Sequence, residues 1–347
     1  MGIPEEEVRR IQLTGGSTYI VSIPRRWVDR LGIKRGGLVS VTEIDDSIII
    51  RPKGVKLEER PKRAVIMTYD NVTPEGLVRR VVSAYLMGYN IIQVKNPEKR
   101  IDLKQRYAVK EFVKRKLVGT EILSETPNEL TLQVLLSYPE LSVNDALRRM
   151  SVITISMHRD AIEALSSGNP QLAREVVAMD DEVDRFSLYI VRLLKEAASD
   201  RRILQEIGLH SPKECLGYRL ITKSVERVAD HAADIAENSL MLTLSGLSED
   251  VVNELRSMSS SAIKLFERAM NSLYEWSYKS ADAVLEGIVE TRGMEASALQ
   301  KIIKNAPPED VPSLRLILES ILRTAEYGSD IAEAVLNMTI VDEIKEE

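Results

Sequence analysis

The chain has 347 residues, of which 44% are hydrophobic and 5% aromatic, and its formal net charge is −6 at pH 7. This length exceeds that of one small domain, so we expect two or three domains with sizeable cores. The single cysteine, Cys215, excludes intramolecular disulfides and zinc sites of the CxxC type.

Nothing in the sequence indicates secretion or insertion into a membrane. The first residues, MGIPEEEVRR, lack the apolar segment of a signal peptide. No stretch reaches the roughly 18 uninterrupted apolar residues that a membrane span requires. We therefore expect a soluble, cytoplasmic protein.

The charge is distributed unevenly along the chain. Ten lysines and arginines against four acids give residues 8–56 a net charge of +6. Residues 63–135 carry +4, whereas residues 136–347 carry −13. The basic front favours a nucleic acid or another anionic partner, and the acidic remainder favours a cation or simple hydration.

Residues 8–53 are typical of a small β-rich module. Two strands flank a Gly-Gly turn at 15–16, a proline opens a short helix over 24–33, and two more strands surround a turn at 45–46. Such a module is too small to cover its own strand edges, so we expect two copies to associate through them.

Residues 63–135 alternate strands and helices in the order βαβαββ. This order predicts a small α/β sandwich with some parallel strand pairing. The expected elements are strands at 64–68 and 90–95, helices at 74–87 and 102–117, and a hairpin over 119–135.

The rest of the chain is predicted to be all helical, in two sets of three helices that form tandem antiparallel bundles. The first set covers about 142–244 and the second about 248–343. The expected helices are 142–166, 170–205, 212–244, 248–277, 279–304 and 311–343.

The third helices of the two sets are an internal repeat. RLITKSVERVADHAADIAENSLML at 219–242 aligns without a gap to RLILESILRTAEYGSDIAEAVLNM at 315–338. The match indicates that the helical half arose by duplication. Both copies carry a row of acids that ends in DIAE.

In the first copy the acids lie at i, i+4, i+8 and i+11, within roughly 80° of helical arc. These residues are Glu226, Asp230, Asp234 and Glu237. Like charges so placed repel one another, which requires a compensating positive charge. Asp180 and Asp184 share a face of the preceding helix, so two facing acid pairs could chelate a metal ion through oxygen.

The second copy has a weaker form of this pattern. Glu326, Asp330 and Glu333 are its candidate ligands, but Leu322 stands where Glu226 stood. A solvated or salt-bridged face remains an open alternative to a metal site, because Lys223 shares the first row and Arg227 lies nearby. The sequence does not distinguish iron, zinc, magnesium and manganese.

The N-terminal module concentrates basic residues among few acids. Arginines on a rigid β scaffold suit contacts with nucleic-acid phosphates and base edges, although a solvated basic surface is the alternative. The candidate DNA-binding residues are Arg9, Arg10, Arg25, Arg26, Arg30, Lys34 and Arg35.

No known catalytic motif is present: the sequence lacks a P-loop, GxGxxG, HExxH and GxSxG. We therefore predict that the chain is not an enzyme.

Two resemblances to known families sharpen these predictions. KSVERVADHAADIAE at 223–237, with its echo AEYGSDIAE at 325–333, resembles the signature of the PhoU family of phosphate-signalling proteins. The resemblance covers about 142–343. It implies PhoU-like helical bundles and metal clusters held by the candidate acids above, which include Asp180 and Asp184.

The N-terminal segment RRIQLTGGSTYIVSIPRRWVDRLGIKRGGLVSV at 9–41 resembles the SpoVT/AbrB family of swapped-hairpin DNA-binding domains. In that family two chains interlace to close one small β-barrel and present arginines to DNA. Gly37 stands where the family usually has aspartate. The combination with PhoU-like repeats resembles archaeal proteins described as phosphate uptake regulators.

From the residues and these resemblances we expect a homodimeric, DNA-binding regulator of phosphate uptake and homeostasis. Its helical repeats would sense state through divalent or ferric metal ions, phosphate held by metal, or a protein partner such as a phosphate ABC transporter or a sensor kinase. The main alternative is an interaction protein that does not bind DNA and inhibits the transporter or kinase directly. A metal-dependent enzyme or storage protein is a third interpretation.

Overall fold

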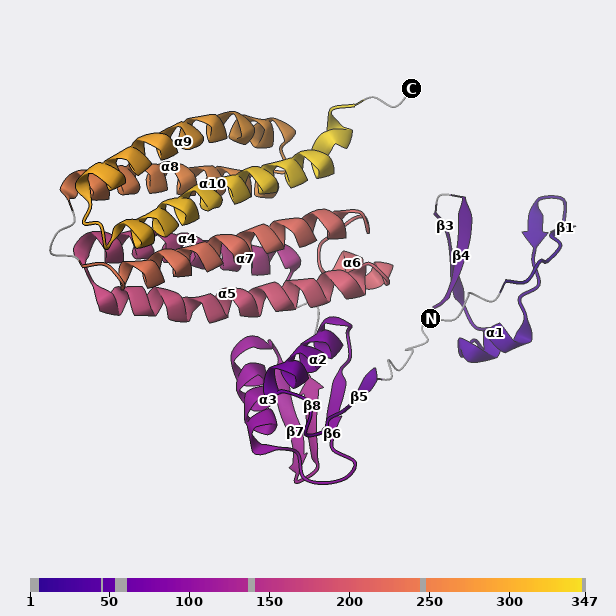
Figure 1. The fold of residues 1–347 in the computed structure, drawn as a ribbon. Coiled ribbons are helices and arrows are strands. Elements are labelled where there is room, and N and C mark those ends of the chain that lie inside the picture. The colour runs from indigo at the N-terminus through magenta and orange to yellow at the C-terminus, as the bar shows by residue number, and fades with distance from the viewer. Residues whose placement is uncertain (1–5, 45, 54–60, 137–140, 244–247, 345–347) are drawn as a thin grey trace. The chain divides into compact units, whose positions relative to one another are not determined.

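The computed structural model describes residues 6–44, 46–53, 61–136, 141–243 and 248–344. Its contacts divide the chain into two units, residues 1–61 and 62–347 (Figure 1). A β-rich N-terminal region is followed by a small sheet domain and then by helices, which confirms the predicted order of fold classes. Asp45 and the predicted repeat boundary at 244 lie outside the described residues.

The N-terminal unit consists of two separate antiparallel strand pairs and one short helix. Gly15 and Gly16 have φ angles of +64° and +80°, and they form the tight turn of the first pair. The elements are β1 (Gln12–Thr14), β2 (Thr18–Ile20), α1 (Arg25–Arg30), β3 (Val39–Ile44) and β4 (Ser47–Pro52).

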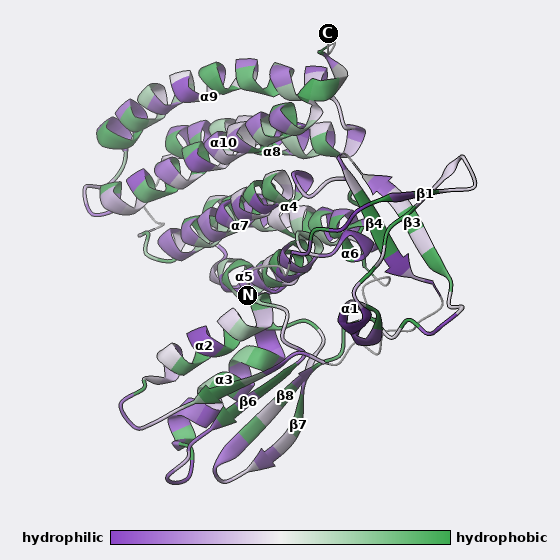
Figure 2. Ribbon diagram, turned by 90° about the vertical axis from the view of Figure 1, so that its right-hand side faces the viewer, coloured by the Kyte–Doolittle hydropathy of each residue, from purple (hydrophilic) through white to green (hydrophobic). Residues whose placement is uncertain are grey.

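The described residues of this unit form no hydrophobic core of their own. Among its described residues only Pro24 is buried, whereas Tyr19, Val41 and Ile48 are 70%, 63% and 73% exposed. Figure 2 shows the apolar colouring along β4. Apolar strands left open in this way need another surface to cover them.

The next 73 residues or so form a four-stranded sheet with two helices. The strand order is β5-β6-β8-β7, with β5 and β6 parallel and the other pairs antiparallel. This confirms the predicted βαβαββ sequence of elements. They are β5 (Arg63–Met67), α2 (Pro74–Leu86), β6 (Ile91–Lys95), α3 (Leu103–Lys116), β7 (Thr120–Thr126) and β8 (Glu129–Val134).

Local sequence explains both helices of this domain. Thr73 and Asp102 accept hydrogen bonds from the first free backbone N–H groups of α2 and α3. The helices cover one face of the sheet, where Leu77, Tyr85 and Leu132 are fully or almost fully buried.

The helical part contains two similar sets of long helices. The single helix expected over 170–205 is instead two helices, because Asp200 caps a new one by accepting a hydrogen bond from Arg202 N–H. The helices are α4 (Val143–Ser167), α5 (Pro170–Ala197), α6 (Arg201–Glu206), α7 (Glu214–Ser239), α8 (Glu249–Glu275), α9 (Tyr278–Asn305) and α10 (Val311–Thr339), followed by the 3₁₀ turn η3 (Ile340–Asp342).

The two sets of helices form the predicted tandem bundles, and the two bundles share one hydrophobic core. Met157 of α4, Val228 of α7, Phe266 of α8 and Ile321 of α10 all belong to the same fully buried cluster. The repeated helices α7 and α10 lie side by side at its centre. Close packing depends on Gly328, where a Cβ would lie 3.1 Å from the backbone nitrogen of Phe266.

His158 lies at the junction of the two repeats. Its Nε2 lies 2.8 Å from the Ser259 hydroxyl and its Nδ1 lies 3.4 Å from that of Thr324. The ring is fully buried. Burial, with smaller contributions from Arg159 and His231, lowers the pKa of His158 from 6.5 to about 4.

This burial predicts a sensitivity to acid. Below pH 6.5 His158 becomes protonated in the unfolded chain but stays neutral in the folded chain. The free energy of unfolding should therefore fall as the pH is lowered from about 6.5 to about 4, by on the order of 3 kcal/mol. Denaturant titrations across this range, on wild type and His158→Gln, measure the difference in slope. Equal slopes in the two proteins would contradict the assignment.

Helix α5 carries the contact between the helical part and the sheet domain, since both α2 and α3 pack on it. Arg192 of α5 is fully buried and donates hydrogen bonds to the carbonyl oxygens of Tyr85 and Tyr89, at 2.5 and 3.1 Å. In the part of the chain that the structure describes, no helix has the length and apolar character needed to cross a membrane.

Candidate functional site

Three of the predicted acids meet between α5 and α7. Asp180 and Asp184 lie one turn apart on α5 and face Asp230 on α7. One carboxylate oxygen from each lies within 4.8 Å of the other two, and all three residues are half-buried. This is the only such group of three among the residues that the structure describes.

Charged carboxylates as close together as these three repel one another. Burial, followed by the charges of Asp184 and Asp230, raises the pKa of Asp180 from 3.8 to about 6. Burial and the charge of Glu226 also raise the pKa of Asp230. The Oδ1 atom of Asp180 is buried and has no hydrogen-bond partner within the described ranges. An orphaned carboxylate oxygen beside two others fits a hard cation.

The sheet domain supplies a positive charge to the edge of this group. Lys116, the last residue of α3, places its Nζ 2.5 Å from Asp184 Oδ2 and 2.8 Å from Asp181 Oδ1. Arg115 also pairs with Asp181. Lysine and arginine thus balance Asp181 and part of Asp184, whereas Asp180 forms no ion pair with any residue that the structure describes.

The other acids of the first repeat lie outside the group. Glu226 is one turn before Asp230 and pairs with Lys223 at 2.7 Å. The side chain of Asp234 is 55% exposed and lies 3.5 Å from His231, and Glu237 is exposed. The row predicted from spacing is real, but only its Asp230 joins Asp180 and Asp184.

The second repeat replaces the corresponding cluster by an internal ion pair. Glu326 stands at the position of Asp230 in the gapless alignment, and Arg292 stands as far into α9 as Asp184 stands into α5. Arg292 lies 3.4 Å from Glu326, and Arg323 lies 2.9 Å from it. Asp330 and Glu333 follow Glu326 along α10. Among the described residues, these acids do not form a group of three carboxylates close enough together to hold a metal ion.

The seven candidate DNA-binding residues of the N-terminal unit are all exposed. Arg25, Arg26 and Arg30 lie on α1, Arg9 and Arg10 precede β1, and Lys34 and Arg35 lie in the turn after α1. Glu7 pairs with both Arg9 and Arg26. Arg25 lies 3.5 Å from Asp29.

Sequence reasoning missed two features of this geometry. The positive net charge of residues 63–135 is visible in the sequence, but the contact of α3 with Asp181 and Asp184 depends on how two domains pack. Arg292 could have been found by aligning α5 with α9, where it replaces an acid of the first repeat.

Family models match two separate parts of the chain. The model of the PhoU domain matches residues 147–239. The model described as antidote-toxin recognition MazE, bacterial antitoxin, matches residues 12–58, which overlap the segment 9–41 that resembles SpoVT/AbrB.

Relatives are found for the helical part. The phosphate-specific transport system accessory protein PhoU homolog 1 of Thermotoga maritima is 22% identical over 215 residues, which cover 58% of this chain and 88% of the relative. The PhoU homolog of Aquifex aeolicus is 33% identical over 87 residues, 24% of this chain and 35% of the relative.

Solved structures show the same fold. The phosphate transport system regulatory protein PhoU from Streptococcus pneumoniae aligns with a TM-score of 0.51 and 15% identity, over 59% of this chain and 96% of its own. PhoU from Pseudomonas aeruginosa aligns with a TM-score of 0.51 and 20% identity, over 57% of this chain and 96% of its own. The helical part of the chain therefore has the PhoU fold.

Proposed function

We propose that this chain, which joins a MazE-type domain to a PhoU domain, regulates phosphate transport as a DNA-binding protein whose PhoU helices sense a metal ion. The observation that carries the proposal is the PhoU fold together with a half-buried trio of carboxylates, one of which lacks a partner. The relatives are accessory and regulatory proteins by name, which supports a role without catalysis.

The cation would bind Asp180, Asp184 and Asp230 through oxygen. Carboxylate ligands suit magnesium, manganese or iron better than soft metals. Binding would offset the burial and the repulsion that together raise the pKa of Asp180. Lys116 contacts Asp184, so a cation there would compete with the lysine, and the sheet domain would respond to occupancy.

The N-terminal unit would be completed by a second copy of the chain. Its described residues bury only Pro24, while apolar side chains on all four strands are exposed. Two copies that cover each other's strands would gain a shared core that one copy lacks. A homodimer also repeats its basic residues about a twofold axis, as a palindromic operator requires.

The exposed basic residues of α1 and its flanks would contact DNA. Arginine at a phosphate releases a counterion, so affinity should fall steeply as salt rises. The ion pairs of Glu7 with Arg9 and Arg26 would have to break before these arginines contact DNA. This cost would favour specific over nonspecific binding.

The test combines DNA occupancy in cells with charge reversal. In cells grown with scarce and with ample phosphate, we expect full-length protein to occupy discrete sites that change with phosphate. Arg25→Glu with Arg26→Glu should abolish occupancy, because both residues are exposed on α1. Lys264→Glu with Lys304→Glu makes the same change of charge on exposed positions of α8 and α9 and should leave occupancy intact.

The outcome distinguishes the two candidate functions. If no site is occupied in either condition and phosphate uptake remains regulated, DNA binding is excluded, and the chain acts by direct contact with a transporter or kinase. An affinity for DNA that did not change between low and high salt would also contradict contacts to phosphates.

A further inference from the structure

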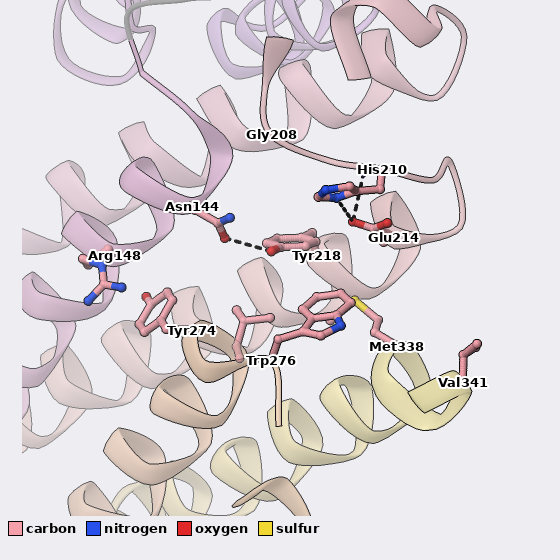
Figure 3. A pocket seen from close by; sticks show the side chains of 11 residues that line it. Asn144, Arg148, Gly208, His210, Glu214, Tyr218, Tyr274, Trp276, Met338 and Val341 are labelled. Atoms are coloured by element: carbon pink, nitrogen blue, oxygen red, sulfur yellow. Dashed lines mark hydrogen bonds and ion pairs between the residues drawn. The ribbon is translucent and has the colours of Figure 1, made fainter. Parts of the chain in front are cut away.

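A cavity of about 640 Å³ opens where the two repeats meet at one end of the bundle (Figure 3). The first repeat contributes the start of α4 and of α7, and the second contributes the ends of α8 and α10. Three aromatic side chains line it: Tyr218, Tyr274 and Trp276. This volume lies within the range of small-molecule sites, roughly 300–1,000 Å³. The cavity does not include any of the acids described above.

Trp276 adopts a backbone conformation that tryptophan rarely takes. It ends α8 with φ +51° and ψ +47°, in the left-handed region that glycine occupies most easily. Among the described residues it is the only non-glycine with positive φ. The conformation projects the indole into the cavity, where it is 38% exposed. Strain of this kind points to a use for the side chain.

Arg148 supplies a positive charge at one end of the cavity. Its guanidinium lies over the ring of Tyr274, 4.0 Å from the ring centroid. This stacking uses one face of the group. The guanidinium has no ion pair or hydrogen-bond partner among the residues the structure describes, so its N–H edges can bind an anion in a bidentate manner.

The opposite end of the cavity offers a hydrogen-bond acceptor. Figure 3 shows Glu214 and His210 on the far side of Tyr218 and Trp276 from Arg148. The Glu214 side chain is only 14% exposed and accepts a hydrogen bond from the His210 backbone N–H at 3.3 Å. Its carboxylate retains further capacity to accept hydrogen bonds.

We propose that this cavity binds a purine nucleotide. The base would stack on Trp276, its N–H groups would donate to Glu214, and the phosphate would accept hydrogen bonds from Arg148. A purine nucleotide has an anionic phosphate at one end and a flat aromatic base with N–H donors at the other. This order matches that of Arg148, Trp276 and Glu214 along the cavity. Stacking on aromatic side chains tolerates either purine, so both adenine and guanine nucleotides fit.

The test uses the full-length protein and the intrinsic fluorescence of Trp276. Trp27 is the second tryptophan, so a Trp27→Phe background leaves Trp276 as the only reporter. AMP, GMP and ATP are titrated in EDTA, which prevents a metal-bridged phosphate at the acidic cluster. We expect saturable quenching by the nucleotides and none by ribose 5-phosphate or inorganic triphosphate.

Matched variants make the test specific. Arg148→Gln should weaken nucleotide binding at least tenfold, whereas Arg149→Gln removes the same charge one residue further on, outside the cavity lining, and should not. Calorimetry on Trp276→Gly should show binding weakened at least tenfold; glycine adopts this φ without strain, which offsets part of the packing lost with the indole.

Three results would overturn the proposal. They are no saturable binding of any purine nucleotide, equal loss in Arg148→Gln and Arg149→Gln, and binding of ribose 5-phosphate as tight as that of AMP. The first would leave the cavity to a protein partner.

Discussion

Asparagine in place of Asp180 is expected to stabilise the cation-free protein at neutral pH. The pKa of this carboxyl is raised to about 6 in the folded state, so above pH 6 the folded chain carries a charge in an unfavourable place. The full shift corresponds to about 3 kcal/mol. Because Asp180 is only half-buried, we expect about 1–2 kcal/mol after solvent screening. The gain should disappear below about pH 4, where the carboxyl is protonated in both states.

A metal ion should reverse the order of the two proteins. Manganese at a hundred times its dissociation constant would add about 2.7 kcal/mol to the wild type, and it should add almost nothing to Asp180→Asn. Denaturant unfolding in EDTA and in manganese, at pH 8 and pH 4, measures both parts. A variant that is less stable than wild type in EDTA at pH 8 would contradict the electrostatic account.

Two further variants act as controls of opposite kind. Asp234→Asn removes an exposed carboxylate from the same row, 55% exposed, and should change neither stability nor manganese binding. Lys116→Gln should tighten manganese binding, because Asp184 loses the ammonium group that lies 2.5 Å away. If manganese stabilises all four proteins equally, the ion binds elsewhere.

Methionine in place of Arg192 is expected to cost about 3–5 kcal/mol of stability, the range for removing one partner of a buried ion pair. The guanidinium is fully buried and hydrogen-bonds the carbonyl groups of Tyr85 and Tyr89 at the end of α2. It also lies 3.6 Å from Glu196, which is buried as well. Without the arginine, two carbonyl groups lose a donor and one carboxylate loses its counter-charge.

The measurement pairs chemical unfolding with amide hydrogen exchange. Exchange should accelerate at the C-terminal end of α2 and along α5 around residue 192, while the core between α7 and α10 should stay protected. Adding Glu196→Leu to Arg192→Met should recover part of the loss, since it removes the stranded carboxylate. A double variant no better than the single one would show that the ion pair contributes little.

Local sequence signals were sufficient to predict most elements of the fold. The proline at the start of the helix over 24–33 and the glycine turn at 15–16 each act over a few residues, and the internal repeat is visible in the residues themselves, so all three can be read from the sequence. The start of α6 was missed because the periodicity of α5 continues across Asp200. The shared core of the two repeats could not be predicted, because helix periodicity shows which face is buried but not which helix covers it.

The candidate cation site was also predicted in part from the sequence. Spacing placed Asp180 with Asp184 on one face and Asp230 on another helix, and the two helices do meet. Spacing could not tell that Asp234 and Glu237 lie beyond the contact, toward solvent. Nor could it tell that Lys116, more than sixty residues earlier in the chain, would reach Asp184.

The ion pair between Arg292 and Glu326 has a mechanical consequence. In the second repeat the counter-charges of Glu326, Arg292 and Arg323, belong to the repeat itself. In the first repeat the counter-charge of Asp184 is Lys116, which belongs to the neighbouring sheet domain. A displacement of α5 relative to the second repeat would therefore be transmitted to the sheet domain through the contacts of Arg192 and Lys116.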